Sequence, residues 1–305
     1  MKRKKRLNGK QVLIVGSGDV ARRIIPWLAT RFGVRALVRR AEECEALRAL
    51  GALPLVADLD DPASLARLAG IAGDVLHCAP PPGKGEDDPR TRHLLAALTR
   101  RGSLPRRIIY ISTTGVYGDC QGAWLDETRP LRPSSARAGR RVAAERCLRD
   151  FALRTGCRVS ILRAPGIYDS AGRLPLGRLE KGDPVLTPAE DVHTNHIHAE
   201  DLARLLVTAL FRGRPNRAYN ASDDSQLKMG DYFDLVADTV GLPRPPRLSR
   251  QELMGCLSPL TLSFMSESRR LRNERIRKEL RFRLAYPTVA SSLAEWTERH
   301  YLPLP

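Results

Sequence analysis

The sequence predicts an α/β protein with a doubly wound parallel sheet and a smaller C-terminal subdomain. From Gln11 to Ser112, short apolar runs alternate with longer amphipathic stretches, which is the pattern of β-α-β units. A glycine-rich turn follows the first apolar run, and a second cycle of helix and strand begins at Ala136. The 305 residues suffice to bury the core of such a sheet and of a smaller unit beside it.

Each expected strand is a short run rich in Val, Ile and Leu, and these runs cover residues 12–15, 35–38, 53–57, 75–79 and 107–112. The helices expected between them cover 20–31, 42–50, 62–69 and 90–100, and they can cross over the sheet right-handed. The second cycle has a helix 136–155, a strand 158–163, a Gly- and Pro-rich loop 166–189, a strand 193–197 and a helix 200–211. We expect a large sheet domain over 1–222, with loop 166–189 contributing to the subdomain, and a small subdomain over 223–305.

The net charge of +17 has two interpretations, because a basic surface attracts phosphate groups of any kind. A nucleic-acid partner is not expected, since aromatic residues do not interleave with the basic ones and a broad arginine excess is the simpler explanation. Basic residues concentrate at 1–6 and 269–283. A weaker hypothesis is that the basic amino terminus docks on an anionic surface.

The sequence predicts a cytoplasmic protein that does not enter the membrane. No stretch approaches the roughly 20 uninterrupted apolar residues of a membrane-spanning helix. The run Val12 to Val15 is too short for the core of a signal peptide. Six scattered cysteines without a C-x-x-C pair indicate reduced thiols rather than a disulfide framework or a zinc site.

The glycine-rich turn predicts a site for a dinucleotide. In a G-x-G-x-x-A turn between a strand and a helix, the first glycine permits the tight turn and the second lets the backbone approach a pyrophosphate. Free N–H groups at the start of the helix face the anion. The sequence therefore predicts a Rossmann-type domain whose phosphate loop consists of Gly16, Ser17, Gly18, Asp19, Val20 and Ala21.

The residues after the second expected strand favour NADP, with NAD as the alternative cofactor. A site for NAD offers a carboxylate to the ribose 2′-hydroxyl about twenty residues after the loop. Here Arg39 and Arg40 follow Val38, and no carboxylate occurs before Glu42. Guanidinium groups pair with a 2′-phosphate through charge-assisted hydrogen bonds. The alternative is that both arginines are simply exposed.

Five further segments resemble the short-chain dehydrogenase/reductase superfamily, in particular its extended and atypical epimerase/dehydratase-like branch. They cover 58–61, 75–79, 111–118, 162–168 and 196–202, in the order of the family. The resemblance implies cofactor contacts at Asp58 and, after the fourth strand, at Ala79 and Pro80. Residues 268–287 resemble the end of such proteins, where a helix of the substrate subdomain leads into a final strand. The arginines of this segment either line the cleft or form an exposed basic helix.

The catalytic tyrosine and lysine of that superfamily are missing here. The resemblance implies a Ser or Thr, a Tyr, and a Lys four residues after the Tyr, and Thr113 occupies the first position. Arg137 and Arg141 occupy the other two, and a guanidinium stays protonated, so it cannot replace a phenol as acid or base. No tyrosine occurs between Tyr117 and Tyr168, so a shift of register does not supply one.

Three alternatives follow from this departure: proton donation by Tyr117 or Tyr168, a reaction that needs no strong base, or cofactor binding without turnover. Nearby cations can lower the pKa of a buried phenol. Arg137 and Arg141 lie one helical turn apart and either clamp an anionic group or form a solvated helix face. As a clamp, they would jointly hold an anionic group of the substrate or of the cofactor. Arg141 is a candidate cofactor contact and Arg137 a candidate substrate contact.

Three histidines, His193, His196 and His198, lie near carboxylates, but their spacing suits a strand leading into a helix better than a metal site. No metal is therefore expected. In the resembling family this block closes the sheet against the subdomain, which makes His196 a candidate substrate contact.

The first functional hypothesis is an NADP-dependent oxidoreductase or epimerase/dehydratase-like enzyme that acts by hydride transfer on a small anionic substrate, such as a nucleotide sugar. Thr113 would hydrogen-bond the reacting oxygen, and Tyr117 or Tyr168 would supply the proton. The second hypothesis is a non-catalytic dinucleotide-binding sensor or scaffold, which Arg137 and Arg141 favour. A homodimer is compatible with both hypotheses.

Overall fold

The computed structural model describes residues 10–169 and 172–301. Within these residues, seven strands form one sheet in which all neighbours run parallel. The strand order is β3-β2-β1-β4-β5-β7-β11, so the direction of winding reverses between β1 and β4. The predicted doubly wound parallel sheet is confirmed.

The five strands expected before residue 113 are all present, and the strand expected at 158–163 is β7. β11 was not expected, because its four residues contain only Ala218 and Tyr219 as apolar positions; pairing with β7 defines it. The strands of the sheet are β1 (Gln11–Val15), β2 (Gly33–Val38), β3 (Leu53–Val56), β4 (Asp74–His77), β5 (Arg107–Thr113), β7 (Arg158–Ala164) and β11 (Arg217–Asn220).

Helices cover both faces of the sheet. One face carries α1 (Asp19–Ala29), α2 (Cys44–Ala49) and α6 (Ala199–Arg212), and the other carries α3 (Pro89–Leu98) and α4 (Ala136–Thr155). The prediction of an α-helix at 62–69 is wrong, because Ser64–Leu68 forms a 3-10 helix. The hydroxyl of Ser64 accepts from the N–H of Asp58 and donates to the carbonyl of Asp61, which holds the segment in a turn.

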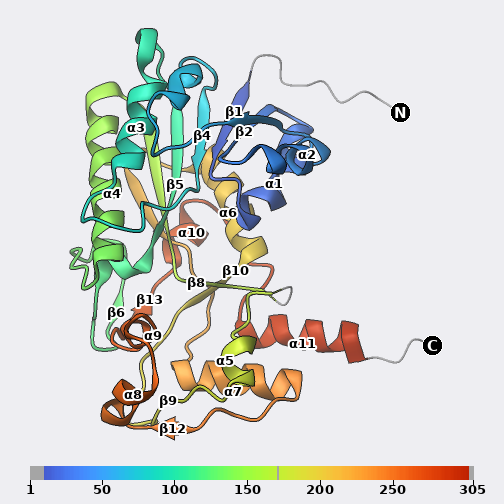
Figure 1. Cartoon of the computed structure of the whole chain (residues 1–305), viewed down its shortest axis with the longest axis vertical. Helices are drawn as coiled ribbons and strands as arrows, with labels where there is room; N and C mark the ends of the chain where they lie inside the picture. Colours follow the sequence, from blue (N-terminus) through green and yellow to red (C-terminus); the bar gives the residue numbers. More distant parts are fainter. Residues whose placement is uncertain (1–9, 170–171, 302–305) are drawn as a thin grey trace.

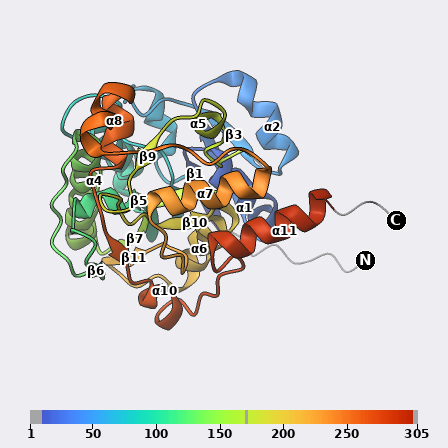
Figure 2. The ribbon, with the colours of Figure 1, turned by 90° about the horizontal axis from the view of Figure 1, so that it is seen from below.

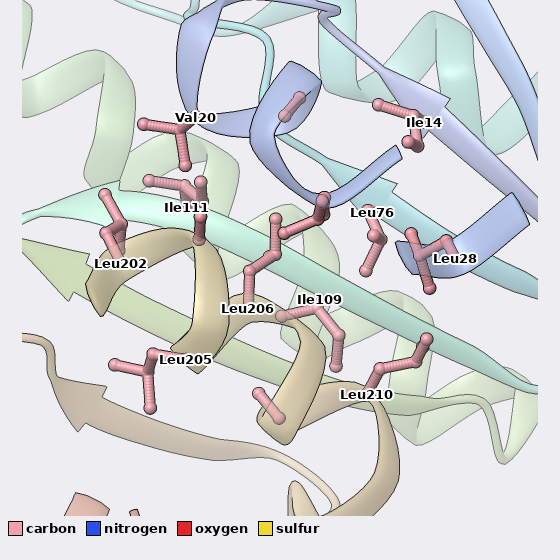
Figure 3. Packing of buried hydrophobic residues seen from close by; sticks show 14 of the residues in the cluster. Ile14, Val20, Leu28, Leu76, Ile109, Ile111, Leu202, Leu205, Leu206 and Leu210 are labelled. Atoms are coloured by element: carbon pink, nitrogen blue, oxygen red, sulfur yellow. The ribbon is translucent and has the colours of Figure 1, made fainter. Parts of the chain in front are cut away.

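Side chains of the strands alternate between two apolar cores. In β1, Val12 and Ile14 join the core under α1 and α6, whereas Leu13 and Val15 join the core under α3 and α4. Figure 3 shows the first core, where sheet residues meet the leucines of α6. Because both faces are buried, the strands are nearly continuous apolar runs in the sequence.

The end of β7 leads directly into β8. From there on, most of the remaining elements lie beyond the carboxyl ends of the strands, in the lower half of Figure 1. Figure 2 shows α7, α8 and α11 in front of this end of the sheet. A third apolar core joins residues between 168 and 192 to residues between 232 and 293. The elements are β8 (Gly166–Tyr168), α5 (Leu176–Glu180), β9 (Val185–Leu186), β10 (His196–His198), α7 (Met229–Val240), β12 (Arg247–Leu248), α8 (Arg250–Cys256), α9 (Pro259–Phe264) and α11 (Val289–Tyr301).

Several expectations for this second half need correction. Segment 166–189 is not one loop, since it contains β8, α5 and β9, and the strand expected at 193–197 is β10, which begins at His196. The final strand implied by the resemblance is absent from the described residues: β13 (Arg270–Leu271) pairs with β6 (Trp124–Leu125) and precedes α10 (Glu274–Lys278). Beyond α10, the buried carboxylate of Asp201 accepts the N–H groups of Ala285 and Tyr286 at 2.9 and 2.8 Å, so these donors are not available for a strand. A boundary at residue 222 stays a prediction.

No helix among the described residues is long and apolar enough to cross a membrane. The basic segment 1–6 lies outside the described residues. All six cysteines are free thiols.

Candidate functional site

A cleft of about 430 Å³ lies at the carboxyl ends of β1 and β4, where the winding of the sheet reverses. Doubly wound folds bind their ligands at this switch point. The structure brings together here every expected cofactor contact except Arg40. The lining includes Gly16, Ser17, Gly18, Asp19, Val20, Ala21, Arg39, Asp58, Ala79, Pro80 and Arg141, and we call it the phosphate-loop cleft.

The two glycines of the loop have different surroundings. Gly16 has a φ of +89°, and a Cβ there would lie 2.4 Å from the backbone nitrogen of Ala79, so the loop packs directly against the end of β4. A Cβ on Gly18 would meet no atom within 4 Å. Gly18 is also the N-cap of α1 and no side chain caps the helix, which leaves its first N–H groups available to an anion. This loop therefore fits a pyrophosphate.

The loop is anchored to β2 through side chains. The hydroxyl of Ser17 donates to the carbonyl of Leu37 at 2.9 Å. Arg22 donates to the carbonyl of Ser17 at 2.9 Å and pairs with Glu43 at 2.9 Å. These contacts hold the start of α1 against the carboxyl end of β2.

Arg39 and Arg40 differ in their surroundings. Arg39 lines the cleft, is exposed, and forms no ion pair within the described parts of the chain. Arg40 lies outside the lining, with a side chain that is 75% exposed and pairs with Glu43 at 3.1 Å. The carboxylate of Glu43 also lines the cleft, where Arg22 and Arg40 compensate its charge. Of these two arginines, Arg39 is therefore the one without an ion-pair partner among the described residues.

Sequence reasoning missed two further arginines of the cleft. Arg90, near the start of α3, pairs with Asp60 at 2.5 Å and donates to the carbonyl of Pro80 at 3.1 Å. Arg173, from the segment after β8, pairs with Asp19 at 3.1 Å. The separation of 154 positions between Arg173 and Asp19 explains why no local pattern indicated this contact.

Arg141 reaches the cleft from α4. Its guanidinium donates to the carbonyl of Ile111 at 2.7 Å and to the hydroxyl of Tyr110 at 3.0 Å. The neighbouring groups are neutral near pH 7: burial, assisted by Arg141, lowers the pKa of His77 to about 3, and burial raises the pKa of the Cys78 thiol to about 12. Unlike its neighbours His77 and Cys78, Arg141 therefore brings a positive charge to this side of the cleft.

A second cavity, of about 230 Å³, is lined by Thr113 and Gly166, which are close in sequence to Ile111 and Ile167 of the phosphate-loop cleft, and we call it the Thr113 cavity. β5 contributes Ile111 to the cleft and Thr113 to the cavity. The cavity is also lined by Arg137, whose guanidinium lies 4.4 Å from the ring centre of Phe264 and has no carboxylate partner among the described residues. The hydroxyl oxygen of Thr113 accepts from the N–H of Gly115 at 3.3 Å, which orients the side chain.

Arg137 and Arg141 therefore do not form one clamp in this structure, because they line two adjacent cavities. A third cavity of about 380 Å³ shares Thr194 and Asn195 with the Thr113 cavity. It is lined by Trp124, Arg270 and Arg272, and both guanidiniums lie over the Trp124 ring, at 5.2 and 6.0 Å. We call it the Trp124 cavity.

Tyr117 lines none of these three cavities. Its hydroxyl donates to Asn220 at 2.6 Å and accepts from Arg163 at 2.9 Å within a buried network. Burial raises its pKa to about 12, although Arg163 lowers it in part. The expectation that nearby cations lower this pKa is wrong, because desolvation of the phenolate outweighs the cation.

Tyr168 belongs to the third core, and the ring of His196 lies 6.0 Å from its ring. Burial and the carboxylate of Asp223 raise the pKa of Tyr168, so the expected lowering is wrong here too. His196 is 4% exposed and packs on Tyr232 with ring centres 4.3 Å apart, and burial lowers its pKa to about 4. Neither residue lines a cavity described above. In the described residues, no group of three or more His, Cys, Asp and Glu side chains could hold a metal ion.

The parallel sheet and the phosphate-loop cleft at its switch point define a dinucleotide-binding Rossmann protein. The model of the NAD(P)H-binding family matches residues 16–212, and the chain belongs to this family. No curated protein matches the chain in sequence.

Solved structures extend the comparison over nearly the whole chain. A functionally unknown conserved protein from Silicibacter pomeroyi DSS is 31% identical over 96% of this chain and 100% of its own, with a TM-score of 0.80. UDP-glucose 4-epimerase from Thermotoga maritima, with UDP-glucose, is 17% identical, and the match covers 94% of this chain and 97% of the epimerase with a TM-score of 0.76. A short-chain dehydrogenase/reductase superfamily protein from Agrobacterium tumefaciens, with bound NAD, is 19% identical. This match covers 95% of this chain and 96% of that protein with a TM-score of 0.72. The chain therefore has the fold of these epimerase and short-chain dehydrogenase/reductase structures, as predicted.

Proposed function

We propose that this protein is an oxidoreductase or epimerase/dehydratase-like enzyme that prefers NADP and acts on a small anionic substrate in the Thr113 cavity. The observation that carries the proposal is the adjacency of two cavities at the carboxyl end of β5. Ile111 and Arg141 line one of them, and Thr113 and Arg137 line the other. A cofactor in the first would therefore adjoin a substrate in the second.

The residues of the phosphate-loop cleft suit a dinucleotide phosphate. The open face of Gly18 and the uncapped start of α1 suit the pyrophosphate, and the unpaired guanidinium of Arg39 suits a 2′-phosphate. Arg141 would hold the end of the cofactor nearest the substrate. When bound, the dinucleotide would supply a nicotinamide that donates or accepts hydride.

The Thr113 cavity suits a small anion. Its arginine Arg269 is neutralised by Glu267 at 2.5 Å, whereas Arg137 keeps an uncompensated positive charge. Thr113 would donate a hydrogen bond to the reacting oxygen. A nucleotide sugar would have to extend into the Trp124 cavity, whereas a small anion needs only the Thr113 cavity.

Two measurements on purified protein test the proposal. The first is the affinity for NADPH and NADH by calorimetry, where tighter binding of NADPH is expected. The second is a turnover assay on small hydroxy acids, oxo acids and UDP-sugars, followed through the absorbance of the reduced nicotinamide. Arg137→Met should remove turnover of the active substrate, and Arg154→Met, exposed near the other end of α4, is the matched control.

A sensor without chemistry is the second candidate, because Arg137 and Arg141 replace the Tyr and Lys of the family. Tight NADPH binding with no turnover of any of these compounds would favour the sensor. Failure to bind either dinucleotide would contradict both candidates.

A further inference from the structure

The Thr113 cavity contains four ionisable side chains among the described residues: Arg137, His193, Glu267 and Arg269. The arginines keep their protons at any working pH. Glu267 accepts hydrogen bonds from Arg269 at 2.5 Å and from the hydroxyl of Ser134, so both of its carboxylate oxygens already have partners. His193 is therefore the side chain of this cavity suited to exchanging a proton near neutral pH.

The backbone holds His193 from two sides. Its N–H donates to the hydroxyl of Ser268 at 3.0 Å, and its carbonyl accepts from the N–H of Arg269 at 3.5 Å. On the other side it forms an antiparallel bridge with Lys228. Nδ1 of the ring is enclosed and has no hydrogen-bond partner in the described structure. Buried polar atoms are nearly always paired, so this enclosed and unpaired ring nitrogen is unusual.

The surroundings of His193 keep its imidazole neutral. Burial lowers its pKa, the cations Arg270 and Lys228 lower it further, and the carboxylates Asp191 and Asp231 raise it in part. A neutral imidazole is the form that accepts a proton from a hydroxyl group.

We propose that His193 is the proton-transfer residue of the Thr113 cavity, and that the substrate is a small hydroxy carboxylate whose carboxylate binds Arg137. This inference rests on the proposed function, and it supplies the base that the missing tyrosine would provide. The substrate O–H bond breaks and its proton forms an N–H bond on the imidazole. The electron pair of the adjacent C–H bond leaves as hydride for the oxidised dinucleotide, and a C=O bond forms. The imidazolium then releases its proton to water.

The first test observes His193 directly and does not require turnover. Protein labelled with ¹⁵N-histidine is titrated with oxamate, a small unreactive carboxylate, in the presence of NADP, and His193→Gln assigns the His193 ring signals. Oxamate should shift these signals and raise the His193 pKa, because its carboxylate would favour the imidazolium. The shift should be lost in Arg137→Met and kept in Arg154→Met. Unmoved His193 signals at the highest oxamate concentration, or an equal shift in Arg137→Met, would overturn the proposal.

The second test uses the active hydroxy acid found in the turnover assay. His193→Gln should lower kcat by ~10²- to 10⁴-fold, the usual contribution of a general base. NADPH affinity should not change, since His193 does not line the phosphate-loop cleft. In the pH profile of kcat, the fall at low pH should be absent from His193→Gln, because this variant lacks the imidazole. His93→Gln, on α3 and outside both cavities, is the control that keeps turnover.

The two ideas fail in different ways. If His193→Gln turns over substrate at the wild-type rate, the assignment of His193 is overturned, and the proposed function is unaffected. A wild-type protein that binds neither dinucleotide would contradict the proposed function itself.

Discussion

Arg39→Ala is the substitution that most directly tests the preference for NADP. Arg39 lies at the carboxyl end of β2, lines the phosphate-loop cleft and has no ion-pair partner among the described residues. Removing its guanidinium therefore breaks no ion pair among the described residues, although it does remove the electrostatic attraction between Arg39 and Asp60. Arg40, the next residue, is the matched control, because it carries the same charge but lies outside the lining and pairs with Glu43.

The expected effect follows from one charged contact in a cleft that is open to water. A hydrogen bond to a charged group contributes about 1.5–3 kcal/mol, and every 1.4 kcal/mol is a factor of about ten in affinity. Arg39→Ala should therefore weaken NADPH binding by roughly 10- to 150-fold and leave NADH binding nearly unchanged. In Arg39→Glu, repulsion between the carboxylate and the 2′-phosphate should weaken NADPH binding further.

Isothermal titration of each variant with NADPH and NADH at low ionic strength gives the ratio of the two affinities. The expected ranking of NADPH preference is wild type equal to Arg40→Ala, then Arg39→Ala, then Arg39→Glu. An unchanged ratio in Arg39→Ala would refute the assignment of Arg39. An equal effect of Arg40→Ala would show that general surface charge, and not a contact in the cleft, sets the preference.

Three further predictions concern the loop, a buried ion pair and a buried histidine. Gly16→Ala should lower the melting temperature and weaken NADPH binding, because a Cβ 2.4 Å from the Ala79 nitrogen displaces the loop, whereas Gly18→Ala should weaken binding without loss of stability. Glu145→Gln removes the counter-charge of Arg163, in a pair whose side chains are 1% and 3% exposed. It should cost about 3–5 kcal/mol in urea unfolding, whereas Asp238→Asn, in an exposed pair, should cost no measurable stability. For His196, burial lowers the folded-state pKa from 6.5 to about 4. The unfolded chain therefore takes up the proton first on acidification, and wild-type stability relative to His196→Gln should be constant above pH 6.5. Below pH 6.5 it should fall by about 1.4 kcal/mol per pH unit until about pH 4, and a relative stability independent of pH would contradict this.

The sheet and the phosphate loop could be predicted because local rules determine them. β1 buries residues on both faces, so Val12 to Val15 are all apolar, and a loop after such a strand has few alternatives. The helix expected at 136–155 is α4 with the same bounds, because Ser135 caps its start and Gly156 ends it at a φ of 73°. The short elements beyond the sheet could not be predicted in this way. β9 and β12, two residues each, exist only through their pairing with one another.

The surroundings of a side chain could not be predicted from the sequence where its partners lie far away along the chain. Tyr117 meets Asn220 across 103 positions, and only this contact shows that its hydroxyl belongs to a structural network. The sign of its pKa change depends on burial, which the sequence pattern alone does not measure. The same holds for Arg39 and Arg40: they are adjacent and identical, but the end of β2 directs one into the cleft and the other toward Glu43.

The position of α4 bears on Arg137 and Arg141, which stand where the resemblance to short-chain dehydrogenase/reductases implies Tyr and Lys. Residues four apart on this helix lie along the boundary between two cavities, so position 141 meets the phosphate-loop cleft and position 137 meets the Thr113 cavity. In the proposed function the two positions would have separate roles, Arg141 toward the cofactor and Arg137 toward the substrate. Two guanidiniums can hold an anion on each side of the boundary, but neither can move a proton. A protein that turns over at this site needs its base from another element, and among the described residues that line the Thr113 cavity His193 is suited to that role.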